Sequence, residues 1–206
     1  MSPRPKPRGI PAQVSRRLLL SVAICASGVL GLFPAWRAGA QEGVFLSEEE
    51  APKTVFPRAD RIERRVVPAT AELRAQMRAV LGRVQPSVWE DQYVTLSAWQ
   101  RERWLGCAVI VEEIGKHRPI TFVVGVQPDG RVADVAVMAY REAYGGEVRN
   151  TRFLAQYRGK SSSDALQPYV DIKNIAGATL SVEAAGRAVK KGVAVARLTC
   201  GIREGQ

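Results

Sequence analysis

Three apolar segments, LGCAVIVEEI (residues 105–114), ITFVVGV (120–126) and VADVAVMAY (132–140), follow one another with short polar turns between them. They are rich in valine and isoleucine, which favour extended backbone. Pro128-Asp-Gly130 has the order of residues that is typical of a tight turn. Strands joined by such short connections pair antiparallel, because a parallel pair needs a crossover of a dozen or more residues. These segments therefore predict an antiparallel sheet.

The chain before this sheet predicts further strands and two helices. Residues 61–67 alternate in polarity, as a half-buried strand does. Ser47 and Glu50 have the spacing of a capping box, and Thr70 precedes an apolar pattern of helical period. We therefore expect residues 41–104 to pack on the sheet and to complete a single α+β domain, an antiparallel sheet with helices packed on it.

The stretch DIKNIAGATLS (residues 171–181) leads into apolar residues at helical spacing. The first N–H groups of a helix have no intrahelical partner, and the helix dipole favours negative charge there. A phosphate could be held at this helix start, beside the hydroxyl of Thr179. The other interpretation is an ordinary cap, in which Thr179 or Ser181 accepts a hydrogen bond from a backbone N–H. The residues alone favour the cap.

The five residues GATLS (177–181) also resemble the S/T-G-A-T signature of FMN-binding domains, which occur in RnfG-type proteins and in a subunit of the sodium-pumping NADH:quinone oxidoreductase. In that family the closing threonine carries FMN through a phosphoester bond made by a flavin transferase. The resemblance implies that this residue is Thr179, and that its neighbours in the signature contact the cofactor: Gly177, Ala178 and Ser181.

Two further motifs stand in the family's order. Residues 142–146 (EAYGG) resemble a turn that lies against the flavin, and the paired glycines allow positive φ or close approach of backbone to a ligand. The resemblance assigns cofactor contacts to four residues of this turn: Glu142, Tyr144, Gly145 and Gly146. Residues 153–160 (FLAQYRGK) match another family motif, in which Lys160 could pair with the phosphate or the flavin edge. From composition alone the turn would be a solvated loop.

The resemblance covers about residues 105–198 and leaves 199–206 as a polar tail. It implies an electron-carrying flavoprotein with FMN as cofactor, matured by a flavin transferase and served by an unknown redox partner, such as a membrane oxidoreductase complex. We expect no catalytic residue and no metal site. The alternative is a cofactor-free binding or structural module that keeps the fold. Two departures favour that alternative, Ala176 where the family has Ser or Thr and Lys173 where it has Asp.

Residues 1–40 are typical of an export signal. A basic region that includes Arg16-Arg17 precedes the apolar run 18–33, and Ala38-Gly-Ala40 offers small residues to a signal peptidase. The run is shorter than the roughly 20 residues that a spanning helix needs. The arginine pair suits either a twin-arginine or a general secretory signal. We expect an exported protein, periplasmic or otherwise extracytoplasmic, and an uncleaved leader that anchors it to the membrane is the alternative.

The leader also accounts for much of the charge. It holds six of the 30 basic residues and no acidic one, so the net charge of +10 falls to +4 in the remainder. This balance gives no support for nucleic-acid binding, because no basic stripe with interleaved aromatic residues accompanies it.

Cys107 and Cys200 remain after the leader, and their spacing fits neither a haem nor a zinc motif. Export permits a disulfide between them. Free buried cysteines are nonetheless common, and distance in the sequence says nothing about distance in space. The residues alone favour two free thiols.

The leader generates a first prediction, that the mature protein begins at Gln41. The small residues at positions 38 and 40 follow an apolar run too short to serve as a stable anchor. N-terminal sequencing of protein recovered from an exporting host checks this. Recovery of a chain that still contains Arg16-Arg17 would replace the cleaved signal with a retained anchor.

Overall fold

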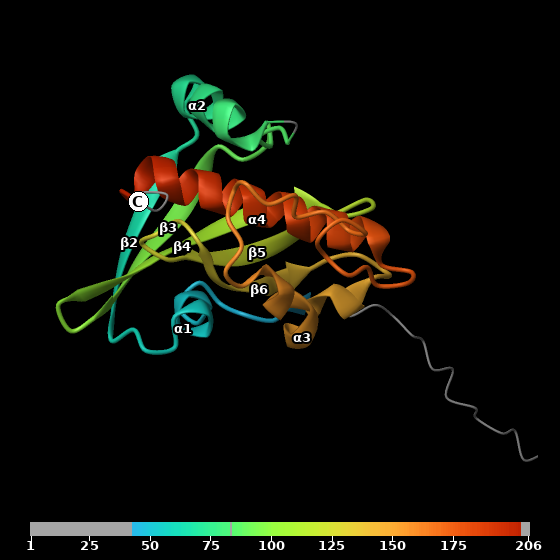
Figure 1. Cartoon of the computed structure of the whole chain (residues 1–206), viewed down its shortest axis with the longest axis horizontal. Coiled ribbons are helices and arrows are strands. Elements are labelled where there is room, and N and C mark those ends of the chain that lie inside the picture. Colours follow the sequence, from blue (N-terminus) through green and yellow to red (C-terminus); the bar gives the residue numbers. More distant parts are fainter. Residues whose placement is uncertain (1–42, 83, 203–206) are drawn as a thin grey trace, which may run out of the picture. The chain divides into compact units, whose positions relative to one another are not determined.

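The computed structural model describes residues 43–82 and 84–202, so the expected leader, its cleavage site and residues 203–206 lie outside the described range. Its centre is a curled six-stranded sheet with the order β1-β6-β5-β4-β3-β2, in which every neighbouring pair is antiparallel (Figure 1). The strands are β1 (Gly43–Val44), β2 (Arg61–Pro68), β3 (Gln92–Gln100), β4 (Arg103–Ile114), β5 (Pro119–Val126) and β6 (Val132–Tyr140). The predicted antiparallel sheet is confirmed.

Four α-helices accompany the sheet in the described part of the chain. They are α1 (Ala51–Val55), α2 (Ala71–Leu81), α3 (Thr151–Leu154) and α4 (Thr179–Thr199), with short 3₁₀ turns at Gly146–Arg149 and Ala155–Tyr157. The fold is a single α+β domain, as the sequence predicts. Within the described residues, no helix is both long enough and apolar enough to cross a bilayer.

Local side-chain hydrogen bonds form at both positions where the sequence predicts a helix start. The Ser47 backbone N–H donates to the Glu50 carboxylate (3.0 Å) and the Glu50 N–H donates to the Ser47 hydroxyl (3.2 Å), which is the reciprocal pattern of a capping box. The Thr70 hydroxyl accepts from the Leu73 N–H at 3.2 Å and caps α2. The helix start at Thr70 is therefore confirmed. The capping-box hydrogen bonds at Ser47 and Glu50 form in the turn before α1, whose own N-cap, Glu50, has no side-chain cap.

The sheet carries a core on each face. In β4, Val109 and Val111 pack in the core beneath α4, whereas Ala108 belongs to the core beneath α1. Successive residues of a strand point to opposite faces, so an almost continuously apolar strand serves both cores. In Figure 1 the long α4 crosses one face of the strands and α1 lies on the other.

Cys107 and Cys200 form a disulfide, so the interpretation of two free thiols is wrong. The end of α4 lies over β4 and brings the two Cα atoms to 6.4 Å, within the range that a disulfide spans. That proximity depends on helix packing, which residue spacing cannot reveal. Ile202 is also buried in the core, so the first residues of the expected polar tail are held by the domain.

A buried ion cluster fixes the middle of α4. Lys191 is fully buried, and its ammonium donates to the Ser87 hydroxyl and the Glu90 carboxylate, each at 2.6 Å, and to the Glu112 carbonyl. Glu113 Oε1 lies 2.9 Å from the same ammonium without hydrogen-bond geometry, and its other oxygen accepts from Arg187 at 3.1 Å. The charge of each member is thus opposed by a neighbour.

This cluster generates a stability prediction for Lys191→Ala. The substitution leaves the Glu90 carboxylate buried without its cation, and breaking a buried ion pair in this way costs about 3–5 kcal/mol. Chemical denaturation should show a loss of that size in the free energy of unfolding. Lys190→Ala, which removes the same charge from a half-exposed neighbour, should change it by no more than about 0.5 kcal/mol.

The same variant should depend on pH. Burial raises the pKa of Glu90, and Lys191 opposes that rise. Without the cation the folded-state pKa climbs further above the unfolded value, and a group with a raised pKa stabilises the fold at low pH and loses that contribution as the pH rises. The deficit of Lys191→Ala against wild type should therefore shrink from neutral pH towards pH 4.5, the ordinary value for glutamate. A constant deficit would assign the loss to packing instead.

Candidate functional site

The start of α4 has no side-chain cap. Its N-cap residue is Ala178, and among the described residues no side chain accepts a hydrogen bond from the first N–H groups. The Thr179 hydroxyl instead accepts from the Asn174 amide at 2.9 Å, and the Ser181 hydroxyl lies 2.9 Å from that of Tyr140. The interpretation of Thr179 or Ser181 as an ordinary cap is therefore wrong, because both hydroxyls are directed to other partners. The positive end of a 21-residue helix is left without a side-chain acceptor.

Gly145 joins the glycine turn to this helix start. It adopts the left-handed conformation (φ +86°), and a Cβ there would lie 2.6 Å from Ser181 Oγ and 3.5 Å from the Ala178 Cα. The Tyr140 hydroxyl donates to the Tyr144 carbonyl and holds the turn in place. Two motifs more than thirty residues apart in the sequence are thus in contact.

The two glycines of the turn are not equivalent. Gly146 has no positive φ, and a Cβ there would meet only the Arg149 side chain, at the ordinary contact distance of 3.5 Å. Only Gly145 combines the positive φ and the close approach that paired glycines permit.

Glu142 is buried and directed at the turn between β4 and β5. Its carboxylate accepts hydrogen bonds from the backbone N–H groups of His117 and Arg118. Burial would raise the pKa of Glu142, but these N–H groups outweigh that effect and hold the pKa below its ordinary value. The carboxylate is therefore a charged anchor of this turn at neutral pH, and its contact with a flavin stays a prediction.

Lys160 is paired within the protein. Its ammonium lies 3.0 Å from the Asp171 carboxylate, and Asp171 also accepts from the Gln167 N–H at 2.9 Å. Burial tends to raise the pKa of Asp171, yet the Gln167 N–H and the Lys160 ammonium lower it overall. The sequence predicts that the Lys160 ammonium pairs with a phosphate or the flavin edge. In the structure its charge is balanced by the carboxylate of Asp171, eleven residues further along the chain.

Arg149 is the cation that sequence reasoning missed. Its Nε donates to the Gly146 carbonyl at 3.0 Å. Its guanidinium lies over the Phe45 ring, 4.3 Å from the ring centre, and 6.0 Å from the centre of the Tyr140 ring. No carboxylate pairs with it in the part of the chain that the structure describes. Its position three residues after Gly146 only weakly indicates that it lies near the glycines. The 3₁₀ turn over Gly146–Arg149 is what places its side chain there.

Asn174 links Thr179 to an exposed tyrosine. The Asn174 amide that donates to Thr179 also donates to the Tyr169 hydroxyl at 2.5 Å, and its Oδ1 is buried without a hydrogen-bond partner among the described residues. Tyr169 is 79 % exposed and Tyr144, on the adjoining turn, is 84 % exposed. An unsatisfied acceptor and open aromatic faces beside an uncapped helix suit a ligand that is planar, carries an N–H donor and ends in an anion.

Comparison with known proteins identifies such a ligand. The model of the FMN-binding domain family matches residues 115–194, a range that contains the glycine turn, Lys160 and the start of α4. This part of the chain is therefore an FMN-binding domain, a flavoprotein module, and FMN is its cofactor. A search of curated proteins gave no match to the chain.

The residues present fit FMN. The phosphate would lie at the open start of α4 beside Thr179, and the isoalloxazine would find aromatic surface at Tyr144 and Tyr169. No group of three or more His, Cys, Asp or Glu side chains arranged to hold a metal ion occurs among residues 43–82 and 84–202.

The inequality of the two glycines yields a prediction. Gly145→Ala forces a side chain into left-handed backbone, at about 1–2 kcal/mol, and against the Ser181 hydroxyl. It should lower the flavin content of purified protein, measured by absorbance, together with the melting temperature. Gly146→Ala is the matched control and should leave both nearly unchanged. Equal losses in the two variants would show that the contact between Gly145 and the helix start is not what matters in this turn.

Proposed function

We propose that this protein is an exported flavoprotein that carries electrons, with its FMN attached to Thr179 through a phosphoester bond. The observation that carries this proposal is the convergence of separate segments on one point. The hydroxyl of Thr179 lies at the uncapped start of α4, and Gly145 brings the glycine turn against the same start. A cofactor at this point would be held by few charged side chains, because most of those nearby already have partners in the protein.

Thr179 is suited to esterification by its surroundings. Asn174 donates to its oxygen and so fixes the hydroxyl, while leaving the hydroxyl proton available for loss. The open N–H groups and the dipole of α4 would stabilise a phosphate on this oxygen. Attachment requires a flavin transferase as maturation partner, and it resembles the chemistry of RnfG-type proteins and of the FMN-carrying subunit of the sodium-pumping NADH:quinone oxidoreductase.

Electron transfer would be supplied by the flavin, which accepts and donates electrons one or two at a time when bound. The protein's own residues bind it, orient it and set the charge around it. The guanidinium of Arg149 lacks a carboxylate partner among the described residues and would favour extra electron density on a nearby cofactor. Exposed Tyr144 and Tyr169 leave the site open to a redox partner, for which a membrane oxidoreductase complex is our hypothesis.

Export rests on two independent features. The leader pattern lies outside the described residues and remains a sequence argument. The disulfide between Cys107 and Cys200 adds support, since such bonds persist mainly in oxidising compartments such as the periplasm. A covalent tether also suits that location, because a cofactor that dissociates outside the cytoplasm is lost.

The test is the mass of the intact protein, purified from a host that expresses a matching flavin transferase. Wild type should exceed the polypeptide by one FMN less one water, and the flavin should stay attached after denaturation. Thr179→Ala should remove the adduct and cost about 0.5–1.5 kcal/mol of stability, because it deletes the hydrogen bond from Asn174 but no helix cap.

Ser181→Ala is the matched control, because it removes the other hydroxyl of the helix start and should keep the adduct. An unmodified wild-type mass with flavin released on denaturation would overturn covalent attachment and leave a bound flavin. An adduct that survives Thr179→Ala but disappears in Ser181→Ala would move the attachment to Ser181.

A further inference from the structure

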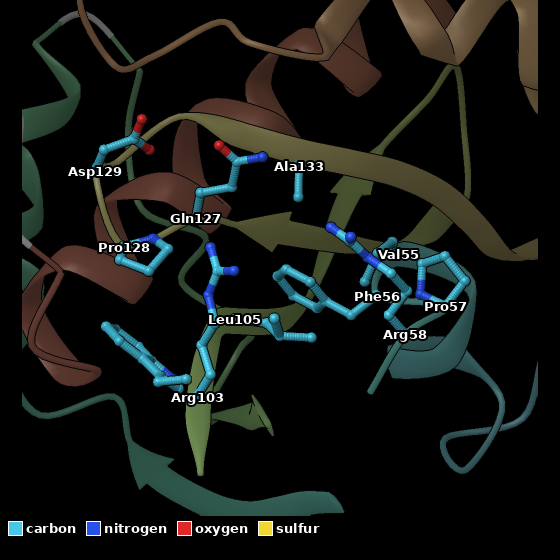
Figure 2. Close-up of a pocket in the computed structure, with 11 residues that line it drawn as sticks. Val55, Phe56, Pro57, Arg58, Arg103, Leu105, Gln127, Pro128, Asp129 and Ala133 are labelled. Atoms are coloured by element: carbon cyan, nitrogen blue, oxygen red, sulfur yellow. The ribbon is translucent and has the colours of Figure 1, made fainter. Parts of the chain in front are cut away.

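A second pocket lies at the other end of the sheet. It has a volume of about 430 Å³ and is formed where the end of α1 meets the beginnings of β4 and β6 and the turn after β5. Figure 2 shows the residues that line it. We call it the α1 pocket; the lining residues that matter below are Phe56, Arg58, Arg103, Leu105, Asp129 and Ala133.

Glycines shape the floor of the α1 pocket. A Cβ on Gly106 would lie 2.9 Å from Cζ of the Phe56 ring, and a Cβ on Gly125 would lie 3.3 Å from its Cε2. Both strands therefore leave room for the ring to press onto the backbone. The result is a fixed aromatic floor, extended by the half-buried Leu105.

Two arginines provide the charge. Figure 2 shows the side chains of Arg58 and Arg103 reaching into the pocket from opposite walls, with the Phe56 ring between them. Neither guanidinium has an ion-pair or hydrogen-bond partner in the part of the chain that the structure describes, although both are exposed. Asp129 is the one acidic residue of the lining, and Arg131 lies 3.9 Å from it. The lining is therefore net positive over an apolar floor.

We propose that the α1 pocket binds an amphiphilic anion, a small molecule whose carboxylate or phosphate is held by Arg58 and Arg103 and whose apolar body lies on Phe56. Guanidinium groups recognise these two anions through paired N–H donors, which is the geometry that a free arginine offers. The volume lies in the range of small-molecule sites, which are mostly apolar with a few polar groups that fix orientation.

The pocket is separate from the flavin. Ala133, in its lining, and Tyr140, beside Ser181, stand seven residues apart on β6, which corresponds to about 23 Å at 3.3 Å per residue. FMN at Thr179 cannot reach across that distance with its phosphate fixed at α4. The α1 pocket therefore takes a second ligand, and its occupancy does not depend on the proposed function.

The experiment is calorimetric titration of the purified mature protein with three probes that share a naphthyl body, 2-naphthoate, 2-naphthyl phosphate and 2-naphthamide. One or both anions should bind, and the neutral amide should bind at least about tenfold more weakly, because it offers no charge to the arginines. The two anions distinguish a carboxylate ligand from a phosphate ligand. Binding of all three probes alike, or a Kd weaker than about 1 mM for both anions, would overturn the proposal.

Variants locate the binding. Arg58→Gln and Arg103→Gln should each weaken the preferred anion at least about tenfold, while melting temperatures confirm the fold. Arg101→Gln is the matched control, since it removes the same charge two residues from Arg103 but outside the lining. Thr179→Ala should leave the affinity unchanged. Equal weakening by the control, or loss of binding in Thr179→Ala alone, would place the anion elsewhere and refute the α1 pocket.

Discussion

The packing of α4 across the sheet is the constraint on which the other features of this protein depend. The Lys191 ammonium donates hydrogen bonds to the Glu90 carboxylate and the Glu112 carbonyl. Gly192 lets the helix approach the sheet so closely that a Cβ there would lie 2.7 Å from Val124. A disulfide ties the end of the helix to β4. Since a helix is stiff, fixing its middle and its end also fixes its start, about 18 Å from Lys191 at 1.5 Å per residue. The helix start then has one place in the fold, and the candidate site for FMN adjoins it.

The candidate site for FMN offers hydroxyls, backbone and aromatic surface more than charge. Several ionisable groups near it already have partners within the protein. Glu142 accepts hydrogen bonds from the turn after β4, and Asp171 forms an ion pair with Lys160. What remains for a cofactor is the open end of α4, the Thr179 hydroxyl and the guanidinium of Arg149. The covalent tether that we propose would suit such a site, because a covalent bond supplies retention that side-chain contacts would otherwise have to provide.

Much of the fold and part of the site follow from local sequence. Alternation and turn residues identify strands, Thr70 identifies the start of α2, and residues 171–181 resemble the FMN-binding signature. These predictions succeed because strand period, turn chemistry and capping depend on residues only a few positions apart. Which residues of the signature contact FMN stays a prediction, since the family match covers residues 115–194 only as a range.

The tertiary structure alone decided which distant groups meet. It paired Cys107 with Cys200 in a disulfide and Asp171 with Lys160 in an ion pair. It placed the Ser181 hydroxyl beside that of Tyr140. It also made the two glycines of the turn different, because only Gly145 lies against Ser181. It also brought Arg149 over the glycine turn and formed the α1 pocket from three separate segments. Each of these outcomes is a distance between parts of the chain that local propensity leaves undetermined, and it is fixed only when α4 and α1 pack on opposite faces of the sheet.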